Sequence, residues 1–272
     1  MKIDPSIFKS YDVRGIYPVT INEEIVEKFG IAFVNKFNLG KVAVGYDGRI
    51  SSPALKEALI SGITKAGADA VDLGISSTDM TYVASAMYSD IDGAVMITAS
   101  HNPREYNGFK VVTKGAIALS AEEGLFDLRD MIISDNLKEA PKVGTIEKRD
   151  MYDAYRDKLV SLIDLEALKP LRIVIDAGNG VGGFIVEKVF KNLPVEIIPL
   201  YFEIDGNFPN HQPSPIEEKN IAELKKKVLE EKAALGLAFD GDGDRVYFVA
   251  EKGTGTTATI ILAMLAKNTL LQ

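Results

Sequence analysis

"KVAVGYDGRISSPALKEALISGITKAGADAVDLG", residues 41–74, is the stretch that decides the fold class of this chain. Its first seven residues are a short apolar run that ends in Asp47. A segment with helical spacing follows, with serines at its start, a proline in its first turn and a glycine at its end. A second apolar run, residues 68–74, completes a strand–helix–strand unit, which predicts two parallel strands in one sheet.

The alternation continues along the chain. Helical patterns cover residues 78–89 and 120–135, and apolar strand patterns cover residues 92–100 and 109–113. Proline, glycine and charged residues then cluster at 139–150, which indicates a domain boundary. After it the strand and helix signals repeat in a second unit.

We therefore expect an α/β protein made of two consecutive three-layer α/β/α domains with mixed, mostly parallel sheets. The expected boundaries are residues 1–145 for the first domain and residues 146–252 for the second. Residues 253–272 are expected to start a third domain with a single helix.

Composition and charge narrow the classes of function. The 272 residues carry a formal net charge of −8, which makes a nucleic-acid partner unfavourable. No run of about 18 apolar residues occurs, so no membrane association is expected. The absence of cysteine and of a secretory signal pattern fits a cytoplasmic protein.

The stretch "FDGDGDRV" places Asp240, Asp242 and Asp244 in one loop after an apolar run. Three carboxylates this close repel one another unless a cation lies among them, and their hard oxygens suit Mg²⁺. Two alternatives remain open. Asp240 and Glu251 stand at positions 1 and 12 of an EF-hand loop, but position 6 is Arg245 where that loop requires glycine. The loop could also be an acidic solvated turn.

The stretch "VMITASHNPREYNGFK", residues 95–110, ends an apolar strand with Ser100. Ligands bind at such strand ends in α/β sheets, and a serine there can be a nucleophile. His101 is the adjacent residue, and no G-x-S-x-G elbow is present, so a hydrolase triad is unfavourable. A serine that carries a phosphoryl group fits better. The alternative is that Ser100 and Asn102 only stabilise the turn before Pro103.

Several polar residues lie in predicted loops and are candidates for phosphate binding. They are Lys9, Arg14, Arg49, Asn102 and His211. Arg49 directly precedes the start of a predicted helix, a position that favours phosphate. Each of the basic residues could also be an ordinary surface charge, and His211 could equally anchor its own loop.

A rival pattern lies at Gly178, Gly180 and Gly183. These glycines have G-x-G-x-x-G spacing between a predicted strand and helix, and Glu203 follows about 20 residues later. Such a fingerprint predicts NAD binding. It leaves Ser100 and the three aspartates unexplained, and the glycines could serve only strand–helix packing.

Five stretches together resemble the α-D-phosphohexomutases, the phosphomannomutase/phosphoglucomutase family. They are "FKSYDVRG", "TASHNPREYNGFK", "DAGNGVGG", "DGNFPNHQPSP" and "FDGDGDR", in that order. The resemblance covers nearly the whole chain. It matches the first two of the family's four domains and the opening helix of the third.

The resemblance implies a mutase that interconverts hexose 1-phosphate and hexose 6-phosphate of mannose or glucose through a bisphosphorylated sugar. It implies that Ser100 carries the phosphoryl group and, with the three aspartates, binds Mg²⁺. It implies that Lys110 is the general acid/base and that His101, Arg14 and Arg245 line the active site. A hexose 1,6-bisphosphate is the implied activator.

The family's third domain contacts the sugar and its fourth binds the substrate's non-reacting phosphate. We therefore expect weak or no turnover by this chain alone. The apolar helix at residues 257–272 is expected to mediate self-association or binding of a separate C-terminal chain. The corresponding alternative function is a non-catalytic or split-enzyme fragment that binds Mg²⁺ and a partner chain.

Overall fold

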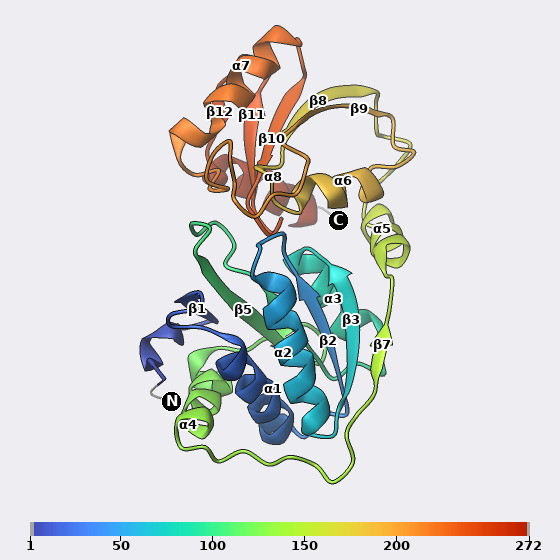
Figure 1. Ribbon diagram of the computed structural model, residues 1–272. Helices are drawn as coiled ribbons and strands as arrows, with labels where there is room; N and C mark the ends of the chain where they lie inside the picture. The colour runs from blue at the N-terminus through green and yellow to red at the C-terminus, as the bar shows by residue number, and fades with distance from the viewer. Residues whose placement is uncertain (1–2, 271–272) are drawn as a thin grey trace.

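The computed structural model describes residues 3–270 as two α/β domains (Figure 1). In Figure 1 the first domain, blue to green, lies below the second, yellow to red. A long connection after helix α4 (Phe126–Ile133) runs along the first domain to helix α5 (Tyr152–Val160), beside the second. No helix in the described residues has both the length and the apolar character needed to cross a membrane.

The sheet of the first domain has the strand order β1-β5-β4-β2-β3-β7, with β6 paired to β5. Strands β4, β2, β3 and β7 run parallel, whereas β5 is antiparallel to β4, β1 and β6. The strands are β1 (Asp12–Ile16), β2 (Lys41–Tyr46), β3 (Asp69–Ile75), β4 (Gly93–Ile97), β5 (Tyr106–Thr113), β6 (Ile117–Ala118) and β7 (Ile146–Lys148).

Alternation of side chains along the strands gives this sheet two buried faces. Val42 and Val44 point to one face, where they join a cluster with helices α1 (Glu23–Phe37), α2 (Ser52–Lys65) and α4. Ala43 points to the other, which α3 (Thr78–Met87) and α5 cover. The short helical turns η1 (Pro5–Ile7) and η2 (Ala121–Leu125) precede β1 and α4. The first domain therefore has three layers.

The second domain has a five-stranded sheet in the order β12-β11-β10-β8-β9. Strands β8, β9 and β10 are parallel, and β11 and β12 are antiparallel additions. Helix α6 (Gly182–Val189) contributes to the core on one face and α7 (Ala222–Glu230), preceded by η3 (Glu218–Ile221), to the core on the other. The strands are β8 (Leu171–Asp176), β9 (Val195–Leu200), β10 (Leu235–Phe239), β11 (Val246–Ala250) and β12 (Gly255–Thr256).

The predicted α/β class with mixed, mostly parallel sheets is confirmed. Every strand of the first sheet except β5, and every strand of the second sheet except β11, runs in the same direction. Strands β5 and β11 run the opposite way because the chain reverses directly from β4 into β5 and from β10 into β11. Strand β7 pairs with β3, so the first domain extends to Lys148 rather than ending at residue 145.

The C-terminal part also differs from the expected division. Strand β12 pairs with β11, so the second sheet extends beyond residue 252. The predicted helix is present as α8 (Ala258–Leu270) and lies against β11, where Ile261, Leu262 and Leu265 line a hollow with Phe248. The last two residues of the predicted helix, 271 and 272, lie outside the residues that the structure describes.

Candidate active site

Ser100 lies in the loop between β4 and β5, which we call the serine loop (residues 98–106). Its φ angle is 52°, in the left-handed region that non-glycine residues seldom adopt and that carries strain. The backbone N–H of Ser100 donates to Thr98 Oγ1 at 2.7 Å. Its hydroxyl donates to Asp240 Oδ2 at 2.6 Å. The loop thus directs the hydroxyl out of the first domain and toward the second.

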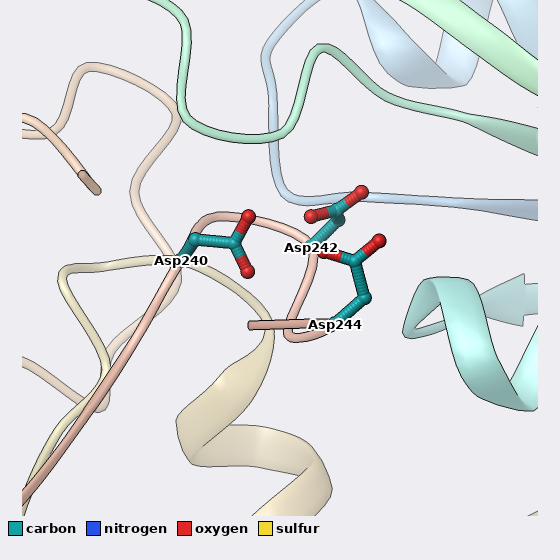
Figure 2. A group of neighbouring side chains, drawn as sticks. All are labelled: Asp240, Asp242 and Asp244. Atoms are coloured by element: carbon teal, nitrogen blue, oxygen red, sulfur yellow. The ribbon is translucent and has the colours of Figure 1, made fainter. Parts of the chain in front are cut away.

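The three aspartates lie in the turn between β10 and β11, the aspartate loop (residues 240–245). Figure 2 shows their carboxyl groups gathered on this single loop, and one oxygen of each lies within 4.8 Å of the others. Asp240 and Asp242 are fully buried. A Cβ on Gly241 would lie 2.5 Å from the carbonyl oxygen of Ser100, so glycine is what permits the two loops to approach this closely.

Besides Ser100, two residues of the first domain bind the aspartate loop through their side chains. Lys110 Nζ, on β5, lies 2.7 Å from Asp242 Oδ2 and 2.5 Å from Asp244 Oδ2. The Thr78 hydroxyl, at the start of α3, donates to Asp242 Oδ2 at 2.7 Å. Burial alone would raise the pKa of Asp242, but Lys110 and the hydrogen bond from Thr78 hold it well below its usual range. The same carboxylates outweigh burial and raise the pKa of Lys110, which is therefore an ammonium ion.

The aspartate loop fits a divalent cation. Asp242 Oδ1 and Asp244 Oδ1 are buried without a hydrogen-bond partner, and such oxygens are costly unless they bind a cation or water. Burial, together with the charges of Asp242 and Asp244, raises the pKa of Asp240 to about 7. A cation at the loop would relieve both costs. Oxygen-only ligands are those that Mg²⁺ and Ca²⁺ prefer.

The EF-hand interpretation is wrong. Antiparallel strands β10 and β11 flank the aspartate loop, where an EF-hand has two helices. Glu251 lies in the exposed turn after β11. The solvated-turn interpretation is also wrong, because two of the three carboxylates are fully buried.

Three predicted residues place positive charge or a polar ring beside Ser100. Arg245 donates to the Ser100 hydroxyl, to Asp240 and to His101 Nδ1. Arg14, held by Asp12 at 2.9 Å, donates to the carbonyl oxygen of Ala99. Burial and the charges of Arg245 and Arg14 lower the pKa of His101, so its ring is neutral near pH 7.

Arg49 is not placed for phosphate binding. Its side chain is 0% exposed. All five of its N–H donors are used: Nε donates to Asp47, and the two terminal nitrogens donate to backbone carbonyls of the serine loop. The prediction that Arg49 binds phosphate directly is therefore wrong.

His211 is likewise a loop anchor. Its Nε2 lies 3.1 Å from Asp176 Oδ2 and its Nδ1 lies 2.9 Å from the carbonyl oxygen of Gln212, so both ring nitrogens are occupied. The neighbouring Gln212 side chain then donates to the carbonyl oxygen of His101 at 2.7 Å. His211 thereby holds a segment that binds the serine loop, and the prediction that it contacts phosphate is wrong.

Two candidates for phosphate binding remain, Asn102 and Lys9. Asn102 lies in the serine loop, where its N–H donates to the carbonyl oxygen of Ala99 at 3.0 Å. Its side chain is partly exposed, so it remains a predicted ligand contact. Lys9 is exposed in the turn before β1, and the structure does not bring it into contact with Ser100 or the aspartates.

The glycine fingerprint serves packing within the protein, so the NAD interpretation is wrong. A Cβ on Gly180 would lie 2.7 Å from the backbone of Gly241. The N–H of Val181, at the start of α6, donates to the carbonyl oxygen of Gly241 at 3.2 Å. The helix start that would bind a pyrophosphate therefore supports the aspartate loop instead.

The sequence did not point to three residues that complete the site. Thr78 and Gln212 form the cross-domain hydrogen bonds described above, and Asp47 binds Arg49. Thr78 and Gln212 are ordinary polar residues whose partners are more than 100 positions away. Only Asp47, at the end of an apolar strand, carried a recognisable signal.

Comparison with known proteins matches both domains of the chain to one family. The sequence model of phosphoglucomutase/phosphomannomutase α/β/α domain I matches residues 5–130, and that of domain II matches residues 153–253. The chain is 40% identical over 267 residues to phosphomannomutase/phosphoglucomutase of Pseudomonas aeruginosa, covering 97% of this chain and 56% of that protein. It is 37% identical over 260 residues to a phosphohexose mutase of Xanthomonas campestris, covering 96% of this chain and 58% of that one.

Solved structures give the same result. A phosphoglucomutase/phosphomannomutase family protein of Burkholderia thailandensis superposes with a TM-score of 0.86 at 38% identity, covering 93% of this chain and 56% of that one. A putative phosphomannomutase of Thermus thermophilus shares the fold, with a TM-score of 0.88 at 24% identity, covering 99% of this chain and 62% of that one. This chain thus spans little more than half the length of these relatives, and it belongs to the α-D-phosphohexomutase (phosphoglucomutase/phosphomannomutase) family.

Proposed function

We propose that this chain performs the phosphoserine chemistry of a phosphohexomutase, interconverting hexose 1-phosphate and hexose 6-phosphate of mannose or glucose through a bisphosphorylated sugar. The observation that carries the proposal is the contact between Ser100 Oγ and Asp240, within a cluster of three aspartates and two arginines. A hydroxyl on a carboxylate cluster that fits a cation suits phosphoryl transfer, which depends mainly on positioning and on charge neutralisation.

Each residue has a role in the proposed reaction. Phosphorylated Ser100 donates its phosphoryl group to a sugar hydroxyl, so the bond from phosphorus to the serine oxygen breaks and a bond to the sugar oxygen forms. Lys110, in its ammonium form, donates a proton to the serine oxygen that leaves phosphorus, and the amine that results accepts the proton of the attacking sugar hydroxyl, so that Lys110 ends the step as an ammonium ion again. Arg14, Arg245 and the neutral His101 ring bind the phosphoryl oxygens and hold them in line.

Magnesium is the proposed cofactor. Asp240, Asp242, Asp244 and an oxygen on phosphorylated Ser100 would hold it, and when bound it would neutralise charge on the transferred phosphoryl group. A hexose 1,6-bisphosphate is the proposed activator, because it can phosphorylate Ser100 and leave a monophosphate product. Asn102 and Lys9 remain proposed phosphate contacts, and a cytoplasmic location remains a prediction.

The mutase proposal is tested by conversion of glucose 1-phosphate to glucose 6-phosphate with Mg²⁺ and glucose 1,6-bisphosphate present. We expect turnover that Ser100→Ala abolishes, because in the proposed reaction every phosphoryl group passes through the Ser100 oxygen. Turnover retained by Ser100→Ala would contradict the proposal.

A second candidate function is a fragment that binds Mg²⁺ and a partner chain without turning over alone. The exposed apolar side chains of α8 favour it. They are Ile260, Leu262, Met264, Leu265 and Leu270. Such a surface is unfavourable in water and promotes association. We propose self-association, or binding of a separate C-terminal chain, through residues 257–272.

Light scattering tests this association. We expect a concentration-dependent rise in mass that Leu262→Glu together with Leu265→Glu removes. The matched control makes the same two Leu→Glu substitutions at Leu162 and Leu165, two exposed leucines after α5 with the same spacing. A strictly monomeric parent chain would exclude self-association and leave the separate chain as the partner to be tested by pull-down with the C-terminal half of a family member.

A further inference from the structure

The strongest unexplained feature is the buried guanidinium of Arg49. Nη1 donates to the carbonyl oxygens of Pro103 and Tyr106 at 2.8 and 2.9 Å. Nη2 donates to those of Ser100 and Asn102 at 2.8 and 2.7 Å. One side chain, from the loop after β2, therefore binds four carbonyl oxygens of the serine loop.

Asp47 connects this guanidinium to the other side of Ser100. Its Oδ2 accepts from Arg49 Nε at 3.2 Å and from the Thr98 hydroxyl at 2.7 Å. Thr98 Oγ1 in turn accepts the backbone N–H of Ser100 at 2.7 Å. Ser100 is thus held at its N–H through Thr98 and Asp47, and at its carbonyl oxygen by Arg49.

The second domain covers the same guanidinium. Arg49 Cζ lies 5.1 Å from the centre of the Phe208 ring, within cation–π range. A Cβ on Gly206 would lie 2.6 Å from the backbone nitrogen of Ile50 and 2.7 Å from the carbonyl oxygen of Gly48. The segment at 206–208 therefore contacts the loop that carries Arg49, and water is kept from the guanidinium.

We infer that Arg49, with Asp47 and Thr98, is a positioning clamp that sets the left-handed conformation of Ser100 and thereby places its hydroxyl on Asp240. The catalytic role of the clamp rests on the proposed function, whereas its effect on the conformation of residues 98–106 does not. The strained φ angle of 52° needs surroundings that over-determine it, and these hydrogen bonds provide them.

Only arginine can fill this position. Its rigid planar fork presents five donors, and all five are used here. A lysine has three donors on one nitrogen, so it cannot reach Asp47 and both pairs of carbonyl oxygens together. Arg49→Lys therefore keeps the positive charge and removes the clamp, which makes it the informative variant.

The test measures two properties of Arg49→Lys in the full chain. Amide hydrogen exchange reports on the clamp: we expect the N–H groups of Ser100, Asn102 and Tyr106 to exchange about tenfold faster, as for the loss of one net hydrogen bond. Phosphorylation of Ser100 by glucose 1,6-bisphosphate reports on positioning: we expect its maximal rate to fall about 100-fold, with the half-saturating bisphosphate concentration unchanged.

A matched control separates this effect from general destabilisation. Ile60→Val opens a small cavity in α2, in the same domain core but away from the serine loop. It should leave loop exchange and phosphorylation near parental values. If Arg49→Lys does not fold, Thr98→Val replaces it, because this near-isosteric change removes both hydrogen bonds of the Thr98 hydroxyl and leaves Asp47 paired with Arg49.

The outcomes are distinct. Unchanged exchange at the serine loop overturns the clamp. Faster exchange with an unchanged phosphorylation rate overturns the positioning role. If the parent chain takes no phosphoryl group, the proposed function fails, and the exchange measurement alone then decides whether the clamp exists.

Discussion

The serine loop and the aspartate loop meet at the candidate active site but are stabilised in opposite ways. In the serine loop, the N–H and carbonyl groups of Ser100 are both bonded to fixed partners within its own domain. In the aspartate loop, Asp242 Oδ1 and Asp244 Oδ1 are buried without a hydrogen-bond partner. Three carboxylates crowd there against one lysine and one arginine.

This difference matches the groups the two loops are proposed to carry. A covalently attached phosphoryl group needs a serine whose position is fixed before the substrate arrives. A cation site needs carboxylates that are left short of partners until the metal binds, because full satisfaction within the protein would leave nothing for the metal to gain. The serine loop is preorganised, whereas the aspartate loop retains two buried carboxylate oxygens without a hydrogen-bond partner.

The largest expected effect is the loss of a ligand in the aspartate loop. Asp242→Asn removes a full negative charge from the cluster. Loss of a residue that only hydrogen-bonds to a metal ligand already lowers affinity roughly tenfold, so Asp242→Asn should lower Mg²⁺ affinity by more than this. Titration calorimetry measures it. The matched control is Asp157→Asn, an exposed carboxylate on α5, which should bind Mg²⁺ like the parent. Equal affinities for parent and Asp242→Asn would contradict the metal assignment.

A smaller effect is expected from the first-domain partner of that ligand. Thr78→Val removes the hydroxyl that donates to Asp242 Oδ2 and leaves the carboxylate in place. We expect Mg²⁺ affinity to fall by about tenfold, as for loss of an outer partner of a metal site. Thr81→Val, one turn further along α3, is the control because its hydroxyl donates to the carbonyl oxygen of Ser77 and to Met96. Equal losses in the two variants would mean that α3, rather than the hydroxyl, supports the site.

The smallest effect concerns His211, which links the second domain to the serine loop. Burial alone would lower the pKa of His211, but the hydrogen bond and charge of Asp176 raise it above 6.5. Because the folded-state pKa is raised, the pair stabilises the fold fully below pH 6.5, and this contribution is lost as pH rises through the folded-state value.

His211→Gln should therefore lower the free energy of unfolding by about 1 kcal/mol at low pH and by less at high pH. Urea unfolding of the parent and of His211→Gln, at pH values below and above the pKa of His211, measures the difference between their free energies of unfolding. A difference that does not change with pH would mean that the charge of His211 does not contribute to stability. In an Asp176→Asn background the pH dependence of this difference should disappear.

Sequence patterns predicted most helices and strands, but they did not predict which distant strands pair with one another. Apolar runs and helix caps located most strands and helices, because these signals act over a few residues. Strands β7 and β12 were assigned to the wrong units, because both are short and polar and owe their place to pairing with distant strands. Local signals carry no information on such pairings.

The site shows the same limit. Ser100 and the three aspartates were identifiable because an unusual run of residue types follows an apolar strand. Arg49 and His211 were assigned to phosphate because a sequence gives charge and position but not which donors are already used. Their actual partners are backbone carbonyls and Asp176, and only the folded chain brings these together.

The most direct measurement of the central claim is the mass of the chain before and after incubation with glucose 1,6-bisphosphate and Mg²⁺, followed by peptide mapping. The account predicts the gain of a single phosphoryl group, located on Ser100. Ser100→Ala should gain none and should lower the free energy of unfolding by about 1–3 kcal/mol, because its hydroxyl is buried and donates to a carboxylate. A phosphoryl group on Ser76, Ser77 or any residue other than Ser100, or none on the folded parent chain, would contradict it.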